Sequence, residues 1–216
     1  MPKDTFFNLP EDKRVRIEQA AIEEFGNYHF DASSVNRIVE NAGIAKGSFY
    51  QYFSDKKDLY KHIMSLIITK KLEYMSPLLQ NPFGLDVFTL LHELYASGLS
   101  FALGNPALLE IGNKLLSDPS HELYVEILAE NKEKSDQFFL HILQAAENRG
   151  EIRQGLDLPL VAYLLTTLNI AVSDYYTRRT EKRVYSREMM EDIEKFIDIV
   201  RLGIANNEGG KTVDQS

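Results

Sequence analysis

The stretch from Ala42 to Tyr60, AGIAKGSFYQYFSDKKDLY, is the part of the sequence that says most about the fold. A short turn at 41–44 separates two apolar helical patterns. This spacing is typical of a helix-turn-helix, the unit that places its second helix in the major groove of DNA. On a helical wheel, Ala45, Phe49 and Phe53 fall on one face of the second helix, which predicts that this face packs in a core.

The opposite face of the same helix carries small and polar groups. Gly47, Tyr50 and Gln51 point outward, with Ser48 beside them and Lys46 in the first turn. A glycine inside a helix costs about 1 kcal/mol relative to alanine, so an exposed Gly47 is favoured where the backbone must approach another surface closely. The edge of a DNA groove is one such surface.

Two helices are expected before this one and a longer helix after it. The first spans 11–26 on an apolar stripe, and the second follows Ser33, whose hydroxyl is predicted to cap its free amides. Gly43 ends the second helix, and the longer helix is expected to begin at Ser54 or Asp55. The apolar positions that predict the first two helices are Ile17, Ala20, Ala21, Phe25, Val35, Ile38, Val39 and Ala42.

A second region is expected beyond a patch of Pro, Gly and Asn at 81–84. Turn signals separate it into about five helices, at roughly 84–103, 106–117, 120–149, 158–180 and 186–206. No alternating strand pattern of useful length occurs, so we expect an all-α fold of about nine helices. The last residues, 207–216, are expected to be a disordered tail.

The net charge of −8 is unfavourable for nucleic-acid binding, but the charge is unevenly distributed along the chain. Residues 46–71 carry six Lys against only Asp55 and Asp58, so positive charge is concentrated in this segment. A polyanion would be attracted there and repelled elsewhere, which favours a narrow and oriented contact.

Other classes of site find little support in the sequence. The chain has no Cys, which excludes disulfides, thiolate zinc sites and cysteine nucleophiles. The His residues are too scattered for a metal-binding pattern, and no nucleotide-binding or nucleophile-elbow motif occurs. We therefore expect no metal, no cofactor and no enzymatic activity. Because neither a membrane-spanning run nor a signal peptide is apparent, the protein is expected to stay in the cytoplasm, without a membrane partner.

The segment quoted above resembles the recognition segment of the TetR/AcrR family of transcriptional regulators, and the similarity extends back to about Lys13. The resemblance implies a helix-turn-helix DNA-binding domain at 1–60, with its motif at 33–53, followed by a larger helical domain at 61–206 for ligand binding and dimerisation. Two positions depart from the usual family pattern, because Ala45 stands in place of a serine and His29 in place of a glycine.

The resemblance also implies which residues contact an operator of double-stranded DNA. Ammonium and hydroxyl groups bind phosphate, and the amide of Gln51 can read an adenine edge. The implied contacts are Ser33 and Ser34 on phosphate, Lys46, Gly47, Ser48, Tyr50 and Gln51 in the groove, and Tyr52 and Lys56 on the DNA backbone.

The last two helices of the chain are apolar over more than one stripe, so we expect one face of each to form a symmetric homodimer. The predicted interface consists of Leu164, Leu168, Val172, Tyr176, Ile193, Phe196, Ile197 and Val200. The family also encloses a small-molecule effector in this region. Aromatic and isolated polar side chains on apolar helices are the candidate lining, with ordinary core packing as the alternative for each: Tyr95, Phe101, Phe138, His141, Tyr163 and Asn169.

We therefore interpret the chain as a sequence-specific DNA-binding transcriptional regulator, a dimeric repressor that a small and largely apolar ligand releases from its operator. The alternative is a helical dimer that binds a hydrophobic ligand or a protein partner without productive DNA binding. Ala45 and the net acidity are the features that favour the alternative.

Overall fold

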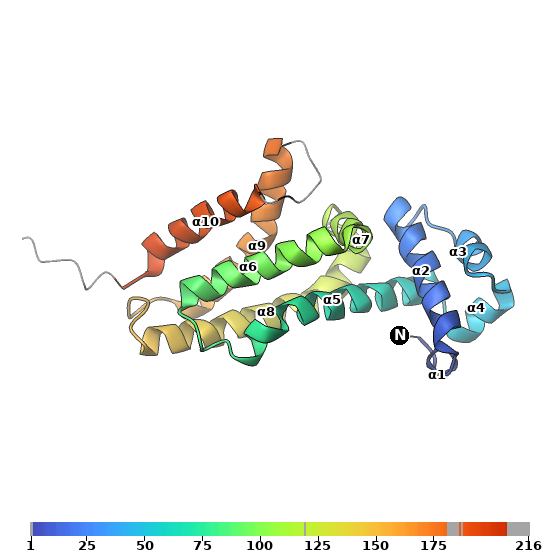
Figure 1. The fold of residues 1–216 in the computed structure, drawn as a ribbon, viewed down its shortest axis with the longest axis horizontal. Helices are drawn as coiled ribbons and strands as arrows, with labels where there is room; N and C mark the ends of the chain where they lie inside the picture. The colour runs from blue at the N-terminus through green and yellow to red at the C-terminus, as the bar shows by residue number, and fades with distance from the viewer. Residues whose placement is uncertain (1, 119, 181–185, 187, 207–216) are drawn as a thin grey trace, which may run out of the picture. The chain divides into compact units, whose positions relative to one another are not determined.

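The computed structural model describes residues 2–118, 120–180, 186 and 188–206, and over these residues the chain is helical, without named strands (Figure 1). The all-α prediction is therefore confirmed, and each predicted helix has a counterpart. The helices are α1 (Asp4–Phe7), α2 (Glu11–Asn27), α3 (Val35–Ala42), α4 (Lys46–Tyr52), α5 (Lys56–Gln80), α6 (Val87–Gly104), α7 (Pro106–Leu116), α8 (Glu122–Asn148), α9 (Leu158–Thr180) and α10 (Met189–Ile204). Sequence reasoning did not predict α1, and the tail predicted at 207–216 lies outside the described residues.

The chain forms two compact units. The first comprises Met1–Glu73 and Gly104–Leu128, and the second comprises Tyr74–Leu103 and Ala129–Ser216. The domain boundary predicted after residue 60 falls within the continuous helix α5, which contributes residues to both units. The functional division stays a prediction: a DNA-binding domain at 1–60, and a ligand-binding and dimerisation domain at 61–206.

The first unit is built on the short helices at the blue end of the chain, where α3 packs against α2, and α4 packs against α3 and α1 (Figure 1). Their apolar stripes meet in a core that includes Ile17, Phe25, Ile38 and Phe49, all of them fully or almost fully buried. Removing such side chains from water is the main favourable contribution to folding. Helix α7 packs against α2 in the same unit.

A reciprocal pair of aspartates fixes the start of α5. The N–H of Asp58 donates to Asp55 Oδ1 at 2.8 Å, and the N–H of Ser54 donates to Asp58 Oδ2 at 3.1 Å. Side-chain acceptors at these positions satisfy amides that the first turn of a helix leaves free. The predicted start at Ser54 or Asp55 therefore matches, and α5 continues through Pro77 to Gln80.

The second unit has a core made by one face each of α6, α8, α9 and α10, with Leu91, Leu143, Leu165 and Ile193 among its buried side chains. An isolated antiparallel bridge between Ile152 and Ala205 joins the α8–α9 loop to the end of α10. No helix among the described residues has both the length and the apolar character needed to cross a membrane.

Candidate nucleic-acid interface

The turn between α3 and α4 is set by one glycine. Gly43 has a φ of 64°, in the left-handed region, and its N–H bonds back to the carbonyl of Glu40 at 3.1 Å. A glycine adopts this conformation at no steric cost, which is why helices commonly end at one. The next helix, α4, begins after Ala45, which makes no side-chain cap and is exposed. The prediction that Ala45 lies on the buried face of α4 is therefore wrong.

The two predicted faces of α4 are otherwise as expected. Phe49 and Phe53 are fully buried, while Tyr50 remains 47% exposed. Lys46, Gly47 and Gln51 are also exposed, and Ser48 is half-buried. The structure therefore brings the predicted groove-facing side chains together on one accessible helix surface.

Among the described residues, no packing contact requires a glycine at position 47. A β-carbon built on Gly47 would meet no heavy atom within 4 Å, and its backbone is helical. The residue thus carries the cost of a mid-helix glycine without a packing reason within its own chain. An external surface that approaches the α4 backbone provides such a reason.

Three predicted DNA contacts have structural roles in the first unit. Ser33 is buried, and its hydroxyl donates to the carbonyl of Phe30 at 2.6 Å, so the prediction that it caps α3 is wrong. Tyr52 is buried beside α1. Lys56 donates to the carbonyls of Phe30 at 2.5 Å and Ser33 at 2.9 Å, and burial lowers its pKa below the usual value.

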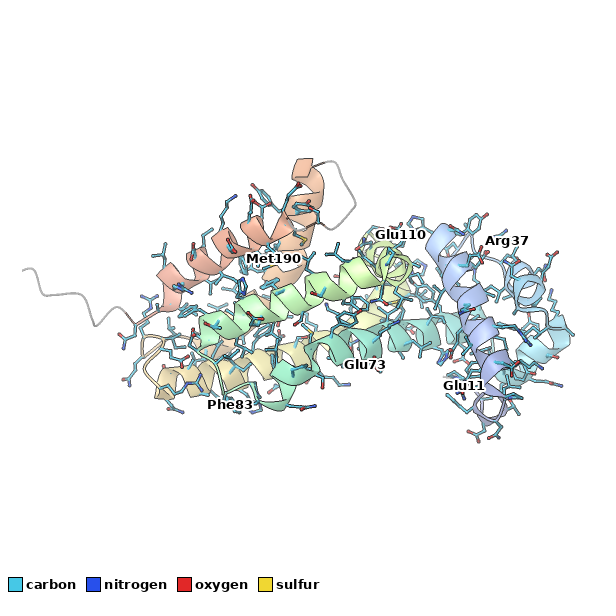
Figure 2. The ribbon with its side chains drawn as sticks, viewed as in Figure 1. Glu11, Arg37, Glu73, Phe83, Glu110 and Met190 are labelled. Atoms are coloured by element: carbon cyan, nitrogen blue, oxygen red, sulfur yellow. The ribbon has the colours of Figure 1, made fainter. Side chains whose placement is uncertain are left out.

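The actual cap of α3 comes from α2. Glu24 is only 3% exposed, and its Oε1 accepts the N–H of Ser34 at 2.7 Å. The guanidinium of Arg37, which is labelled in Figure 2, holds the same carboxylate through Nε at 2.9 Å and Nη2 at 2.5 Å. The guanidinium of Arg37 also makes a cation–π contact with Tyr28, with 4.2 Å between the guanidinium carbon and the ring centroid. Sequence reasoning missed this cluster, although an acidic residue on the apolar stripe of α2 was a signal for it.

The positive charge predicted for residues 46–71 is partly neutralised within the first unit. Lys57 Nζ lies 3.1 Å from Glu122 and 2.6 Å from Glu126, and Lys61 pairs with Glu126 as well. These hydrogen bonds raise the pKa of Lys57 and lower that of Glu126. By contrast, Lys46 is exposed and has no carboxylate partner among the described residues. The cationic surface near α4 is therefore narrower than the sequence indicated.

Four of the eight predicted interface residues lie in the core of a single chain. Val172, Tyr176, Ile193 and Ile197 are buried within the second unit. Leu168, Phe196 and Val200 are half-buried, and only Leu164 is exposed. On the same two helices, the large apolar side chains that the structure describes as exposed are Leu160, Tyr163, Leu164, Tyr175, Ile199 and Leu202.

The six predicted pocket residues lie in different surroundings. Phe101 is buried, Tyr95 and Phe138 sit at the edge of the second core, and His141 and Tyr163 are exposed. The side chain of Asn169 lies outside the described residues. A surface pocket of about 230 Å³ does occur in this unit, but other side chains of α6 and α10 line it. This volume is below the roughly 300 Å³ at which small-molecule pockets begin.

Among the described residues, no group of three or more His, Asp or Glu is placed to hold a metal ion. The geometry of the first unit instead presents an exposed helix whose buried face is fixed by two phenylalanines. Such a helix has the width and the side-chain chemistry to enter a DNA groove.

Comparisons with known proteins agree with this geometry. Residues 17–63 match the family model described as bacterial regulatory proteins, tetR family. A crystal structure of a TetR family transcriptional regulator from Chloroflexus aurantiacus J-10-FL is 32% identical, with a TM-score of 0.67, and the alignment covers 95% of this chain and 99% of that one. A gamma-butyrolactone receptor described as ArpA-like has the same fold at 20% identity, with a TM-score of 0.66 over 92% and 90% of the two chains.

A curated relative is similar over a shorter stretch. The uncharacterized HTH-type transcriptional regulator YvdT of Bacillus subtilis (strain 168) is 40% identical over 73 residues. This alignment covers 34% of the present chain and about a third, 35%, of the length of YvdT.

Proposed function

The chain belongs to the TetR family of bacterial regulatory proteins, and on that premise we propose that it is a cytoplasmic repressor that binds operator DNA as a homodimer and leaves it when a small ligand binds. The exposed face of α4 is the observation that carries the DNA-binding part of this proposal. Its groove-facing side chains are accessible while its other face is anchored in the core.

Individual roles follow from the chemistry of these side chains. Lys46, at the start of α4, attracts phosphate, and Gln51 donates to and accepts from an adenine edge in the major groove. Gly47 lets the backbone come close, and the exposed phenol of Tyr50 contributes a hydroxyl and an apolar ring. Ser34, whose N–H is held by Glu24, offers a hydroxyl at the start of α3.

We assign supporting roles to three residues of the predicted contact set. Ser33 and Lys56 bond to backbone carbonyls of the α2–α3 turn, and Tyr52 packs against α1. Each therefore acts on DNA binding through the position of α3 and α4. This assignment separates them from Lys46, whose ammonium is exposed.

The homodimer is proposed on the exposed apolar side chains of α9 and α10. Ile199 is 70% exposed and Leu202 80% exposed, and burying such side chains against a second copy of the chain is favourable. A twofold dimer places two copies of α4 in successive major grooves, about 34–36 Å apart for a one-turn spacing. The palindromic operator of such a protein mirrors this symmetry.

Ligand release is proposed from the family and from helix α5. Because α5 contributes residues to both compact units, a ligand in the second unit can act on the first through it. The ligand must bind the DNA-incompetent state more tightly, since equal affinity for both states shifts nothing. A protein of the same fold is a gamma-butyrolactone receptor, and this likeness supports the proposal of a small-molecule ligand.

The experiment that tests the proposal is operator selection. Purified protein is used to enrich duplexes from a random-sequence library, and binding of the enriched duplex is compared with that of random DNA. Gln51→Ala is expected to lose discrimination at one base pair, by about 1–3 kcal/mol, while wild-type protein retains it. Equal losses by Gln51→Ala on selected and random duplexes would remove Gln51 as a base reader, and failure to enrich any duplex would refute DNA binding.

A further inference from the structure

The last turn of α4 is capped by residues from the beginning of the chain. Lys3 Nζ donates to the carbonyl of Tyr50 at 2.8 Å, and the N–H of Lys3 donates to the carbonyl of Tyr52 at 2.9 Å. Between them, the hydroxyl of Thr5 donates to the carbonyl of Gln51. Because the carbonyl of Phe49 already accepts the N–H of Phe53, these three are the carbonyls that α4 itself leaves unpaired.

The segment that supplies these donors is itself anchored. Phe6, in the middle of α1, is fully buried, and its ring centroid lies 4.8 Å from that of Phe53 and 5.1 Å from that of His62. The ring of Tyr52 lies 6.3 Å away. The same aromatic cluster therefore fixes both α1 and the buried face of α4. Lys3 and Thr5 are held next to the carbonyls that they cap.

Helix α4 is too short to be stable on its own local interactions. It has seven residues, whereas isolated helices of fewer than about 12–15 residues are marginal in water. Its first turn has no side-chain cap, because Ala45 has no hydroxyl. A cation near the C-terminal end of a helix is also favourable to the helix dipole. The bonds from Lys3 and Thr5 therefore add to the packing of the aromatic cluster in ordering the last turn.

We propose that Lys3 and Thr5 are positioning residues for base reading, which hold the last turn of α4 so that Tyr50 and Gln51 present their side chains to the groove in one orientation. The capped carbonyls belong to the residues on which the proposed reading of DNA depends. The inference thus rests on the proposed function and adds a determinant of specificity that lies outside the helix-turn-helix.

The test compares Lys3→Met/Thr5→Val with a matched control, Lys70→Met/Thr69→Val. The control removes the same groups from exposed positions on α5, for which no side-chain hydrogen bond, ion pair or ring contact occurs among the described residues. Each variant is titrated with an operator selected by the wild-type protein and with a copy altered at the base pair read by Gln51, at several salt concentrations. Hydrogen exchange of α4 amides is measured on the same variants without DNA.

The positioning role predicts that discrimination between the two duplexes falls about tenfold in the Lys3/Thr5 variant, with an unchanged salt slope, and that the control behaves as wild type. Amides of α4 are expected to exchange faster in the Lys3/Thr5 variant, while those of α2 do not. A single Thr5→Val variant is expected to lose part of both properties, whereas Thr5→Ser, which keeps the hydroxyl, is expected to behave as wild type. Unchanged discrimination and unchanged exchange would overturn the proposal.

A second outcome would also overturn it. If discrimination is retained while the salt slope falls by about one phosphate, Lys3 is a phosphate contact rather than a positioning residue. Failure of the wild-type protein to bind any duplex would count against the proposed function instead. In that case the exchange of α4 amides still decides whether Lys3 and Thr5 order the last turn.

Discussion

The ammonium of Lys56 lies 2.5 Å from the carbonyl oxygen of Phe30, and its nitrogen is 4.4 Å from the centroid of the Phe30 ring. One lysine at the start of α5 thus closes the turn between α2 and α3 by a hydrogen bond and a cation–π contact. The family resemblance implied that Lys56 binds the DNA backbone, but in this structure its ammonium donates to carbonyls of the protein itself.

Replacing Lys56 by methionine is expected to destabilise the first unit by about 1–3 kcal/mol, because partly buried carbonyls lose their donor. Lys46→Met, which removes the same charge from an exposed site, is expected to change stability by less than about 0.5 kcal/mol. Urea denaturation of the two variants measures the difference. In DNA titrations only Lys46→Met should lower the salt slope, by about one; the reverse pattern would make Lys56 the phosphate contact.

Gly47→Ala is expected to stabilise the protein and to weaken DNA binding. A β-carbon at this position would meet no heavy atom of the described residues outside the local helix backbone within 4 Å, so the variant gains helix propensity, worth about 0.5–1 kcal/mol. The same methyl group is expected to obstruct the groove and to reduce affinity for the operator about tenfold. Thermal unfolding and anisotropy titrations measure the two effects. Undiminished affinity of the variant would refute the proposal that DNA approaches the α4 backbone closely at Gly47.

Glu24→Gln is expected to lower stability by about 1–3 kcal/mol, because the buried carboxylate holds both Arg37 and the N–H of Ser34. The control is Glu23→Gln, the neighbouring and exposed glutamate, for which a change within about 0.5 kcal/mol is expected. Denaturant unfolding of both variants provides the comparison. Equal stabilities would show that the capping of α3 contributes nothing.

Asp86 makes the start of α6 sensitive to acid. Its burial alone would raise its pKa, but hydrogen bonds from Thr89 and from the N–H of Phe88 outweigh this and hold the pKa of Asp86 below its usual value. A carboxylate with a lowered pKa contributes stability above its unfolded-state pKa, and this contribution is lost as the pH falls through the folded-state value.

Asp86→Ala is therefore expected to cost about 1 kcal/mol near pH 7, as for other helix N-caps, and less once the pH has fallen through the lowered pKa of Asp86. Asp86→Asn keeps a capping oxygen, so it should retain most of the stability at pH 7 and lose this part of the pH dependence. Unfolding free energies across the acid range are the measurement. A constant difference between wild type and Asp86→Ala at all pH values would contradict the assignment.

The dimer proposal predicts that Ile199→Glu/Leu202→Glu yields a folded monomer. Both side chains are largely exposed in the single chain, so the substitution leaves the core intact while placing charge in the interface. Sedimentation velocity and circular dichroism follow assembly and folding, with the exposed loop position Gln154→Glu as the control. A variant that remains dimeric would exclude these residues from the interface.

The helices could be predicted because their signals are local. Apolar spacing and flanking glycines mark α3 and α4 within a few residues of their ends, and helix propensity needs no distant partner. Helix α1 was not predicted because four residues are too few to show a period, and it is held by the burial of Phe6. Pro77 lies inside α5, although proline usually interrupts a helix, so its sequence alone does not locate the end of α5.

The exposed face of α4 followed from a helical wheel, whereas its supports did not. Lys3 and Tyr50 are 47 positions apart in the sequence, and Lys57 and Glu126 are 69 apart, so no local pattern relates them. The proposed interface on α9 and α10 could not be located from local patterns either. Periodicity identifies two apolar stripes on each helix, but only the packing of the chain determines which stripe its own core buries.

The exposed face of α4 is proposed to bind DNA through a limited number of phosphate contacts and base contacts. The decisive measurement is fluorescence anisotropy of the wild-type protein and of Lys46→Ala/Tyr50→Ala, titrated with the selected operator at several salt concentrations. Binding is expected to be salt-sensitive, with a slope near −0.9 per neutralised phosphate, and to be lost in the double variant. Binding that the double variant retains in full, or the absence of wild-type binding to any duplex from the library, would contradict it and favour a helical dimer that binds a ligand without DNA.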